Sequence, residues 1–138
     1  MRLELVTLSG TKMDEEVYEV IVPTASGVIG VLPGHEPLVT LAVNGIVKVR
    51  RQRGAADMEV FAVNGGIVEV DNNSILILVD EAESAIEIVA SEAEAALERA
   101  KKHLSIAKDP ISINEAQALI DRHAVRLKVA NLRRRHHL

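Results

Sequence analysis

The stretch ILILVDEAESAIEIVASEAEAALERA, residues 75–100, contains the change in composition that decides the fold. It begins with an uninterrupted aliphatic run and ends with alanines at helical spacing. Across the whole chain, 15 of the 18 valines precede residue 85, whereas 11 of the 17 alanines follow residue 84. Valine is restricted at χ1 and favours strands, and alanine is the best helix former. We therefore predict a β domain over residues 1–84 and a helical domain over residues 85–138.

The charge divides in the same way. Residues 1–84 hold 6 Lys and Arg against 13 Asp and Glu, a net charge of −7, and residues 85–138 hold 10 against 7, a net charge of +3. The absence of cysteine excludes disulfides, thiol chemistry and Cys-ligated zinc. Only Tyr18 and Phe61 are aromatic, which argues against a stacking platform for nucleobases. The N-terminus alternates like a strand rather than a signal peptide, and no apolar run is long enough to cross a bilayer, so we expect a cytoplasmic location.

Short apolar runs separated by turn residues fill the first domain and are typical of strands. KVRRQRGAADMEV at 48–60 predicts a hairpin that bends at residues 54–57, and EVDNNSILIL at 69–78 predicts a second one that turns at residues 71–73. Many short strands at close spacing indicate an antiparallel β-sandwich or barrel. The predicted strands cover residues 2–8, 16–22, 37–43, 45–51, 58–63, 66–70 and 74–79.

Two capping-box patterns predict two helices in the second domain. Ser91 with Glu94 and Ser112 with Glu115 both have the spacing in which each side chain satisfies the other residue's free N–H. Pro110 disfavours helical geometry at the residue before it and predicts a break between the helices. Two helices joined by a short link form an antiparallel α-helical hairpin.

The segment GVIGVLPGHEPL, residues 27–38, is unusually apolar for a loop. Its three glycines and two prolines interrupt regular structure, yet Val28, Ile29, Val31 and Leu32 lie among them. Loops normally lie on the surface and carry polar residues. The residues alone leave three alternatives for this segment: it packs on its own core, binds a small ligand, or contacts another protein.

The residues indicate no catalytic, cofactor or metal site. His35 has no nucleophile or carboxylate pair beside it, and the other histidines lack a metal-ligand spacing. The glycines do not form a phosphate-binding loop. The basic end LRRRHHL at 132–138 fits nucleic acid, an acidic protein surface, or a solvated helix terminus. Binding or regulation is favoured over catalysis, and the alternatives are a free-standing β-sandwich that binds a small molecule and a nucleic-acid-binding module.

Three segments resemble the epsilon subunits of F-type ATP synthases, the counterparts of the mitochondrial delta subunit. VPTASGVIGVLPGHEPLVT at 22–40 is similar to the G-x-x-G-x-x-P-G-H-x-P-L-x-T segment of that family. VNGGIVEVDNNSILILVDEA at 63–82 is similar to its Gly-Gly strand pair, and INEAQALIDRHAVRLKVA at 113–130 has the place of its second hairpin helix. The resemblance extends over essentially the whole chain.

The resemblance implies a non-catalytic rotor subunit of the central stalk that couples proton-driven rotation to ATP synthesis. It implies contacts of the β-sandwich with the gamma subunit and the c-subunit ring, and inhibition of ATP hydrolysis by a hairpin that extends into the alpha/beta catalytic head. It also implies a peripheral position on the cytoplasmic face of the bacterial plasma membrane, or on the stromal face of the thylakoid. Nucleic acid is not an expected partner. The expected partner-binding residues are Val28, Ile29, Val31, Leu32, His35 and Leu38 in the loop, and Arg122, Arg126 and Arg133 in a basic stripe on the second helix.

Two departures from the family pattern affect these expectations. Val28 and Ile29 stand where many relatives have an acidic residue in the turn that faces the c ring. An [I/L]-D-x-x-R-A motif that binds ATP in some bacterial relatives aligns with residues 88–93, where Val89 replaces the aspartate and Glu92 replaces the arginine. A glutamate repels phosphates where an arginine would bind them. We therefore expect no tight binding of ATP.

Overall fold

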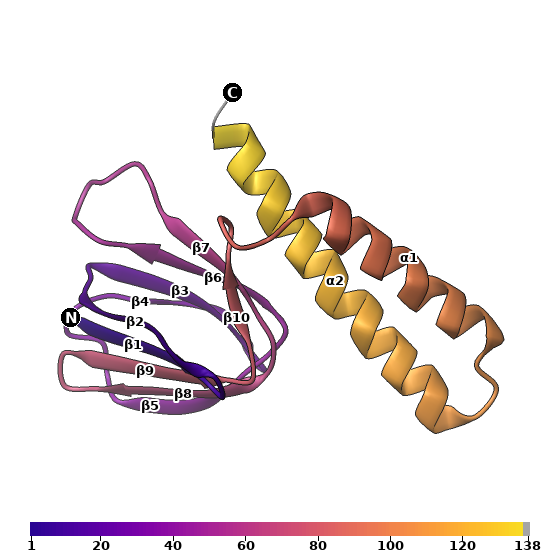
Figure 1. Ribbon diagram of the computed structural model, residues 1–138. Coiled ribbons are helices and arrows are strands. Elements are labelled where there is room, and N and C mark those ends of the chain that lie inside the picture. The colour runs from indigo at the N-terminus through magenta and orange to yellow at the C-terminus, as the bar shows by residue number, and fades with distance from the viewer. Residues whose placement is uncertain (137–138) are drawn as a thin grey trace. The chain divides into compact units, whose positions relative to one another are not determined.

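The computed structural model describes the backbone of residues 1–136 and the side chains of residues 1–132. The chain divides into two compact units, Met1–Ser84 and Ala85–Leu138 (Figure 1). The first unit contains only strands, and the second contains two helices. The fold class, a β-sandwich followed by a helical hairpin, is therefore as predicted from the sequence.

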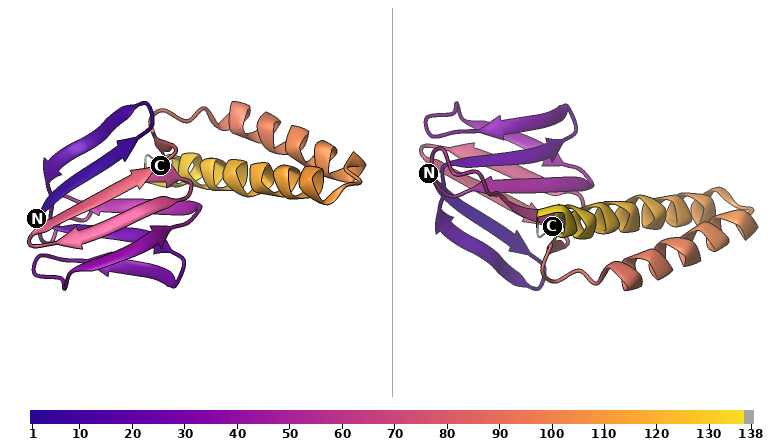
Figure 2. Two further views of the ribbon diagram at one scale, coloured as in Figure 1. Left: turned by 90° about the horizontal axis from the view of Figure 1, so that it is seen from below. Right: turned by 90° about the horizontal axis from the view of Figure 1, so that it is seen from above.

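Ten strands form one hydrogen-bonded sheet that folds over into two layers (Figure 1 and Figure 2). Its order is β10-β7-β6-β3-β5-β8-β9-β1-β2, and β4 pairs with β3 outside this path. A single register pair, Thr24 with Ala42, links β3 to β5, so the sheet divides into layers at this point. The strands are β1 (Arg2–Thr7), β2 (Gly10–Glu16), β3 (Glu19–Thr24), β4 (Gly27–Val31), β5 (Leu38–Ala42), β6 (Gly45–Arg50), β7 (Glu59–Val63), β8 (Gly66–Asp71), β9 (Ser74–Val79) and β10 (Ala82–Ser84).

Alternating side chains place the core between the layers. In β1 and β9, Leu3, Leu5, Ile75 and Ile77 are buried, and the residues between them point outward. These four residues are also neighbours across the strands, because β1 and β9 pair in parallel with Leu3 opposite Ile75. The other strand pairs are antiparallel, as expected. The core cluster draws only on residues 1–82, so the sandwich has a hydrophobic core of its own.

Three strands of the structure were not predicted from the sequence, each for a different reason. In β2 (GTKMDEE) only Met13 is buried, and the rest of the strand is exposed. β10 has only three residues. β4 lies within the segment that was expected to be an irregular loop, and it forms a hairpin with β3 despite its two glycines. Gly27 has a φ of 117°, which glycine adopts without strain at the β3–β4 turn. The strand expected at residues 16–22 lies at Glu19–Thr24.

The second unit is an antiparallel hairpin of α1 (Ala90–Ile106) and α2 (Pro110–His136), which lie side by side (Figure 2). The two expected capping boxes are both wrong. Helix α1 begins after Val89, which makes no side-chain cap. At α2 the cap is Asp109, whose Oδ2 accepts from the backbone N–H of Ser112 at 3.0 Å. Pro110 follows as the first helical residue, where its missing N–H costs nothing.

Candidate partner-binding surfaces

The residues expected to bind partners between positions 27 and 38 do not share one environment. Val31 is fully buried in the core cluster, so the expectation that it contacts a partner is wrong. Its side chain points inward because β4 alternates and residue 31 falls on the inner face. Ile29 and Leu38 are partly buried against the same core. The apolar character of this segment is thus explained in part by the sandwich's own packing.

Val28 and Leu32 are the large aliphatic residues exposed in this segment, with exposed fractions of 71% and 43%. Their exposure suits a contact with a partner but does not identify one. His35 is half-buried, its backbone N–H donates to the carbonyl of Leu32 at 3.1 Å, and its Nδ1 lies 2.7 Å from the carbonyl oxygen of Glu36. Both contacts lie within the turn before β5, and the expected contact of His35 with a partner stays a prediction.

A larger apolar surface lies on the outer face of the layer formed by β5, β8, β9, β1 and β2. The register places Leu41 opposite Ile67, Ile67 opposite Leu78, and Leu78 opposite Val6. We call these four residues, on β5, β8, β9 and β1, the apolar row. Leu41, Ile67 and Leu78 are exposed by 60%, 45% and 42%, and Val39 on β5 by 70%. Contiguous exposed apolar surface of this kind is typical of an interaction site.

Sequence reasoning missed the apolar row, although a signal for it was present. An antiparallel sheet with one solvated face should alternate apolar and polar residues. The segments LVTLA in β5 and SILILV in β9 are apolar on both faces instead. Such strands are either buried on both sides or covered by a partner, and only the register of the sheet shows that their outer residues adjoin one another.

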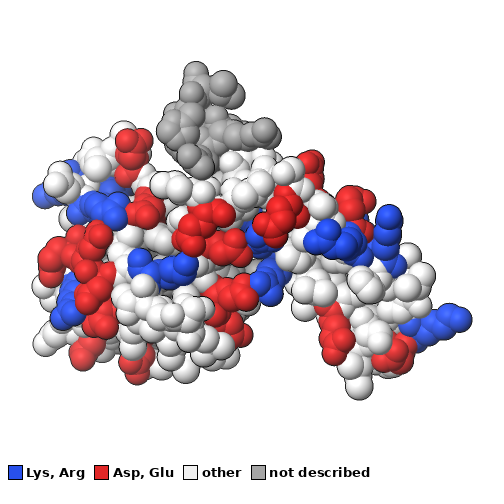
Figure 3. Space-filling model, in the orientation of Figure 1, with Lys and Arg blue, Asp and Glu red and all other residues white. Residues whose placement is uncertain are grey.

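Charged side chains of both signs are interspersed over the face of each unit shown in Figure 3. Several of those in the sandwich form ion pairs, including Arg2 with Asp14 at 2.8 Å and Arg51 with Glu15 at 2.8 Å. The Arg2 guanidinium lowers the pKa of the Asp14 carboxyl through a hydrogen bond. Since opposite charges alternate here, the apolar row is the more distinctive feature of the sandwich surface.

The three arginines expected to face a partner from the second helix also differ from one another. Arg126 is buried, and its Nη2 lies 3.5 Å from Oε1 of Glu92 on α1. In this arrangement of the hairpin its guanidinium contacts the other helix, so its expected contact with a partner requires α2 to leave α1. Arg122 is half-buried. The side chain of Arg133 lies outside the described residues.

Small residues line the contact between α1 and α2. Ala93, Ala96 and Ala100 on α1 and Ala116 on α2 are buried. Because a buried CH₂ contributes about 0.8 kcal/mol, alanines supply less stabilisation per contact than leucines would. The buried face of α1 consists of alanines alone, whereas α2 also buries Val129.

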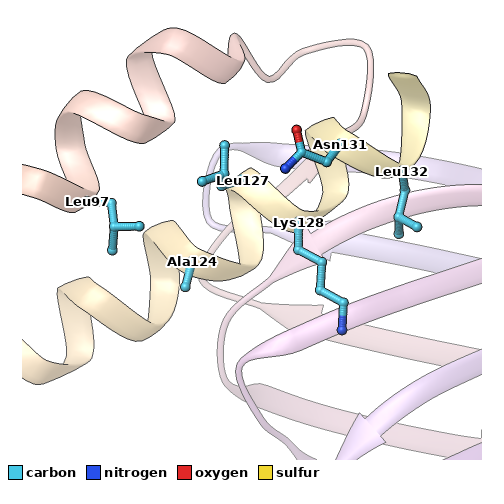
Figure 4. A pocket seen from close by; sticks show the side chains of 6 residues that line it. All are labelled: Leu97, Ala124, Leu127, Lys128, Asn131 and Leu132. Carbon is cyan, nitrogen blue, oxygen red and sulfur yellow. The ribbon is translucent and has the colours of Figure 1, made fainter. Parts of the chain in front are cut away.

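A shallow pocket of about 340 Å³ lies in the hairpin (Figure 4). Leu97 comes from α1, and Ala124, Leu127, Lys128, Asn131 and Leu132 come from α2. Its lining is mainly aliphatic. Among the described residues there is no group of His, Cys, Asp or Glu that could hold a metal ion, and no described helix is long and apolar enough to cross a membrane.

Comparison with known proteins finds relatives of the β-sandwich and of nearly the whole chain. The family model of the ATP synthase delta/epsilon chain β-sandwich domain matches residues 1–85. The ATP synthase epsilon chain of Moorella thermoacetica is 36% identical over 130 residues, which cover 94% of this chain and 96% of the relative. The chloroplastic ATP synthase epsilon chain of Amborella trichopoda is 38% identical over 133 residues, which cover 95% and 97%.

A solved structure shows the same fold. A chain of the Euglena gracilis mitochondrial ATP synthase, from a cryo-EM structure of OSCP, F1 and c-ring in rotational state 1, aligns with a TM-score of 0.79 at 25% identity. The alignment covers 94% of this chain and 79% of that one. The fold is therefore that of a β-sandwich with an appended helical hairpin. The chain belongs to the ATP synthase delta/epsilon chain family.

Proposed function

We propose that this chain is a non-catalytic rotor subunit in the central stalk of an F-type ATP synthase. It couples ion-driven rotation to ATP synthesis by joining the gamma subunit to the c-subunit ring. The relatives, epsilon chains of bacterial and chloroplast ATP synthases, support this role. A peripheral place on the cytoplasmic face of a bacterial plasma membrane, or on the stromal face of the thylakoid, follows from such an assembly.

The apolar row carries the proposal, because it gives the sandwich an exposed surface that a subunit of an assembly would bury. We assign this surface to the gamma subunit. Val28 on β4 and Leu32 directly after it are the candidates for a contact with the c ring. Since neither carries a charge, such a contact would rest on apolar packing rather than on an ion pair.

Co-elution of the chain with purified gamma subunit tests the assignment. Leu41→Asp or Ile67→Asp should weaken binding by roughly 30-fold, the loss of about 2 kcal/mol expected for a central interface residue. The sandwich should stay folded, because both side chains already face solvent. Leu8→Asp is the matched control, since Leu8 is 82% exposed in the β1–β2 turn and lies outside the apolar row. Undiminished gamma binding by both row variants would contradict the assignment.

We further propose that the hairpin restrains ATP hydrolysis when α2 leaves α1 and extends into the alpha/beta catalytic head. The alanine-lined buried face of α1 supports this mobility, and the basic residues of α2 suit an acidic surface of the head. The decisive comparison is the ATPase rate of the catalytic head with no added chain, with the full chain, and with residues 1–84. Only the full chain should slow hydrolysis. Equal ATPase rates in all three samples would contradict the inhibitory role of the hairpin but not the rotor role of the chain.

A further inference from the structure

Arg126 on α2 contacts a histidine of its own helix and a carboxylate of α1. Its Nη1 lies 3.1 Å from Nδ1 of His123, one turn earlier on α2, and its Nη2 lies 3.5 Å from Oε1 of Glu92 on α1. The Arg126 side chain is 9% exposed, whereas that of Glu92 is 60% exposed. An arginine stays protonated and only donates hydrogen bonds. Nδ1 of His123 must therefore be an acceptor here, which requires a neutral imidazole.

The charges around His123 are mostly positive. Arg122 and Arg126 on its own helix and Arg99 on α1 all oppose a positive charge on the ring, and Glu92 on α1 alone favours one. Burial opposes it as well and is the largest cause, so the pKa of His123 lies below its ordinary value of 6.5. The closed hairpin thus favours the neutral histidine that the hydrogen bond to Arg126 requires.

We propose that Glu92, His123 and Arg126 form an acid-sensitive latch that holds α2 against α1, and that protonation of His123 opens it. Protonation places an N–H where Arg126 needs an acceptor and adds a cation beside three arginines. The buried residues of α1 are the alanines Ala93, Ala96 and Ala100, which offset this loss less than leucines would. The latch concerns the hairpin alone, and its effect on ATP hydrolysis rests on the proposed function.

The direction of the pH dependence follows from linkage. A histidine with a lowered pKa in the closed hairpin binds a proton more readily in the open one, so the closed form is favoured above pH 6.5 and loses stability as the pH falls below it. If the open form titrates at the ordinary value, the ratio of open to closed hairpin rises by at most about tenfold between pH 7.5 and pH 5.5.

Spin labels on both helices measure the opening directly. The chain has no cysteine, so Glu94→Cys on α1 and Lys128→Cys on α2 give one labelled pair at exposed positions. The population of the short label distance should fall as the pH falls from 7.5 to 5.5, while circular dichroism shows that both helices persist. In the His123→Gln background the short distance should no longer depend on pH, because the amide stays neutral and its oxygen can accept from Arg126.

His103→Gln is the matched control, because His103 is an exposed histidine on α1 and its replacement should leave the pH dependence unchanged. NMR titration of the unsubstituted chain adds a readout that needs no variant. The His123 ring should titrate below the ordinary histidine pKa of 6.5, together with the loss of the short distance. A distance distribution that does not change with pH, or one that changes equally in the His123→Gln background, would overturn the latch.

ATPase assays separate the latch from the proposed function. Inhibition of the catalytic head by the full chain should strengthen as the pH falls from 7.5 to 5.5, relative to the head with residues 1–84, and His123→Gln should remove this increment. If the label distances show opening but the inhibition does not change, the latch stands and the inhibitory role of α2 falls.

Discussion

At the scale of single residues, β4 shows how much depends on which face a side chain occupies. Val28 and Val31 lie three positions apart on one strand, and their exposed fractions are 71% and 0%. The sequence presents them as equivalent apolar residues of one segment. Strand geometry makes one a surface residue and the other part of the core.

Val31→Asp and Val28→Asp should consequently have opposite outcomes. A carboxylate at position 31 has no hydrogen-bond partner in an apolar core, and the substitution should reduce the free energy of unfolding by at least about 4 kcal/mol. Val28→Asp places the same group in solvent and should leave the sandwich folded. Thermal unfolding of the two variants followed by circular dichroism measures the difference. Similar melting temperatures would show that Val31 is not a core residue.

Gly66 offers a second residue-scale test, based on backbone contact. A Cβ at this position would lie 1.9 Å from the carbonyl oxygen of Leu78 on the neighbouring strand, whereas a Cβ at Gly30 would meet nothing within 4 Å. Gly66→Ala should therefore destabilise the sandwich by about 1–3 kcal/mol as β8 and β9 move apart. Gly30→Ala is the control, since its φ needs no glycine. Chemical denaturation compares the two, and equal midpoints would refute the close approach.

At the scale of elements, the start of α1 is where the sequence signals were misleading. Ser91 and Glu94 have the spacing of a capping box, yet α1 begins at Ala90 and neither residue caps it. The same turn of helix holds Glu92, which pairs with Arg126 on α2. The Ser91–Glu94 spacing predicted a capping bond within α1. The first turn of α1 instead provides Glu92 for the contact with α2.

This arrangement strengthens the expectation that the hairpin does not bind ATP tightly. Glu92 occupies the position of the motif arginine and already pairs with Arg126, and Val89 offers no polar group to a nucleotide. ATP that binds neither form of the hairpin cannot shift its equilibrium. Calorimetric titration of the chain with Mg-ATP should give no saturable heat in the low micromolar range. In the variant Glu92→Arg, a gain of ATP binding would show that Glu92 prevents binding in the native chain. Tight binding of ATP by the native chain would show that the motif alignment is wrong.

At the scale of the whole molecule, the boundary near residue 84 separates a unit with a large core from one held by two helices. The sandwich core includes Leu3, Leu5, Ile75 and Ile77, and no residue beyond Ala82. Residues 1–84 should therefore unfold cooperatively on their own, with a midpoint close to that of the sandwich in the full chain. Differential scanning calorimetry of both proteins measures this. A fragment without a cooperative transition would show that the sandwich needs the helices.

The sequence by itself determined the fold class, the hairpins β6–β7 and β8–β9, and the family, because these depend on local composition, turn residues and short motifs. Asn72 and Asn73 sufficed to mark a turn, since turns are built from neighbouring residues. The tertiary structure alone shows the apolar row, the core position of Val31, the parallel pairing of β1 with β9 and the contact of Arg126 with Glu92. Each of them joins residues that are distant in sequence or depends on which face of a strand turns inward. Long-range register and packing fix such features, and no local pattern records them.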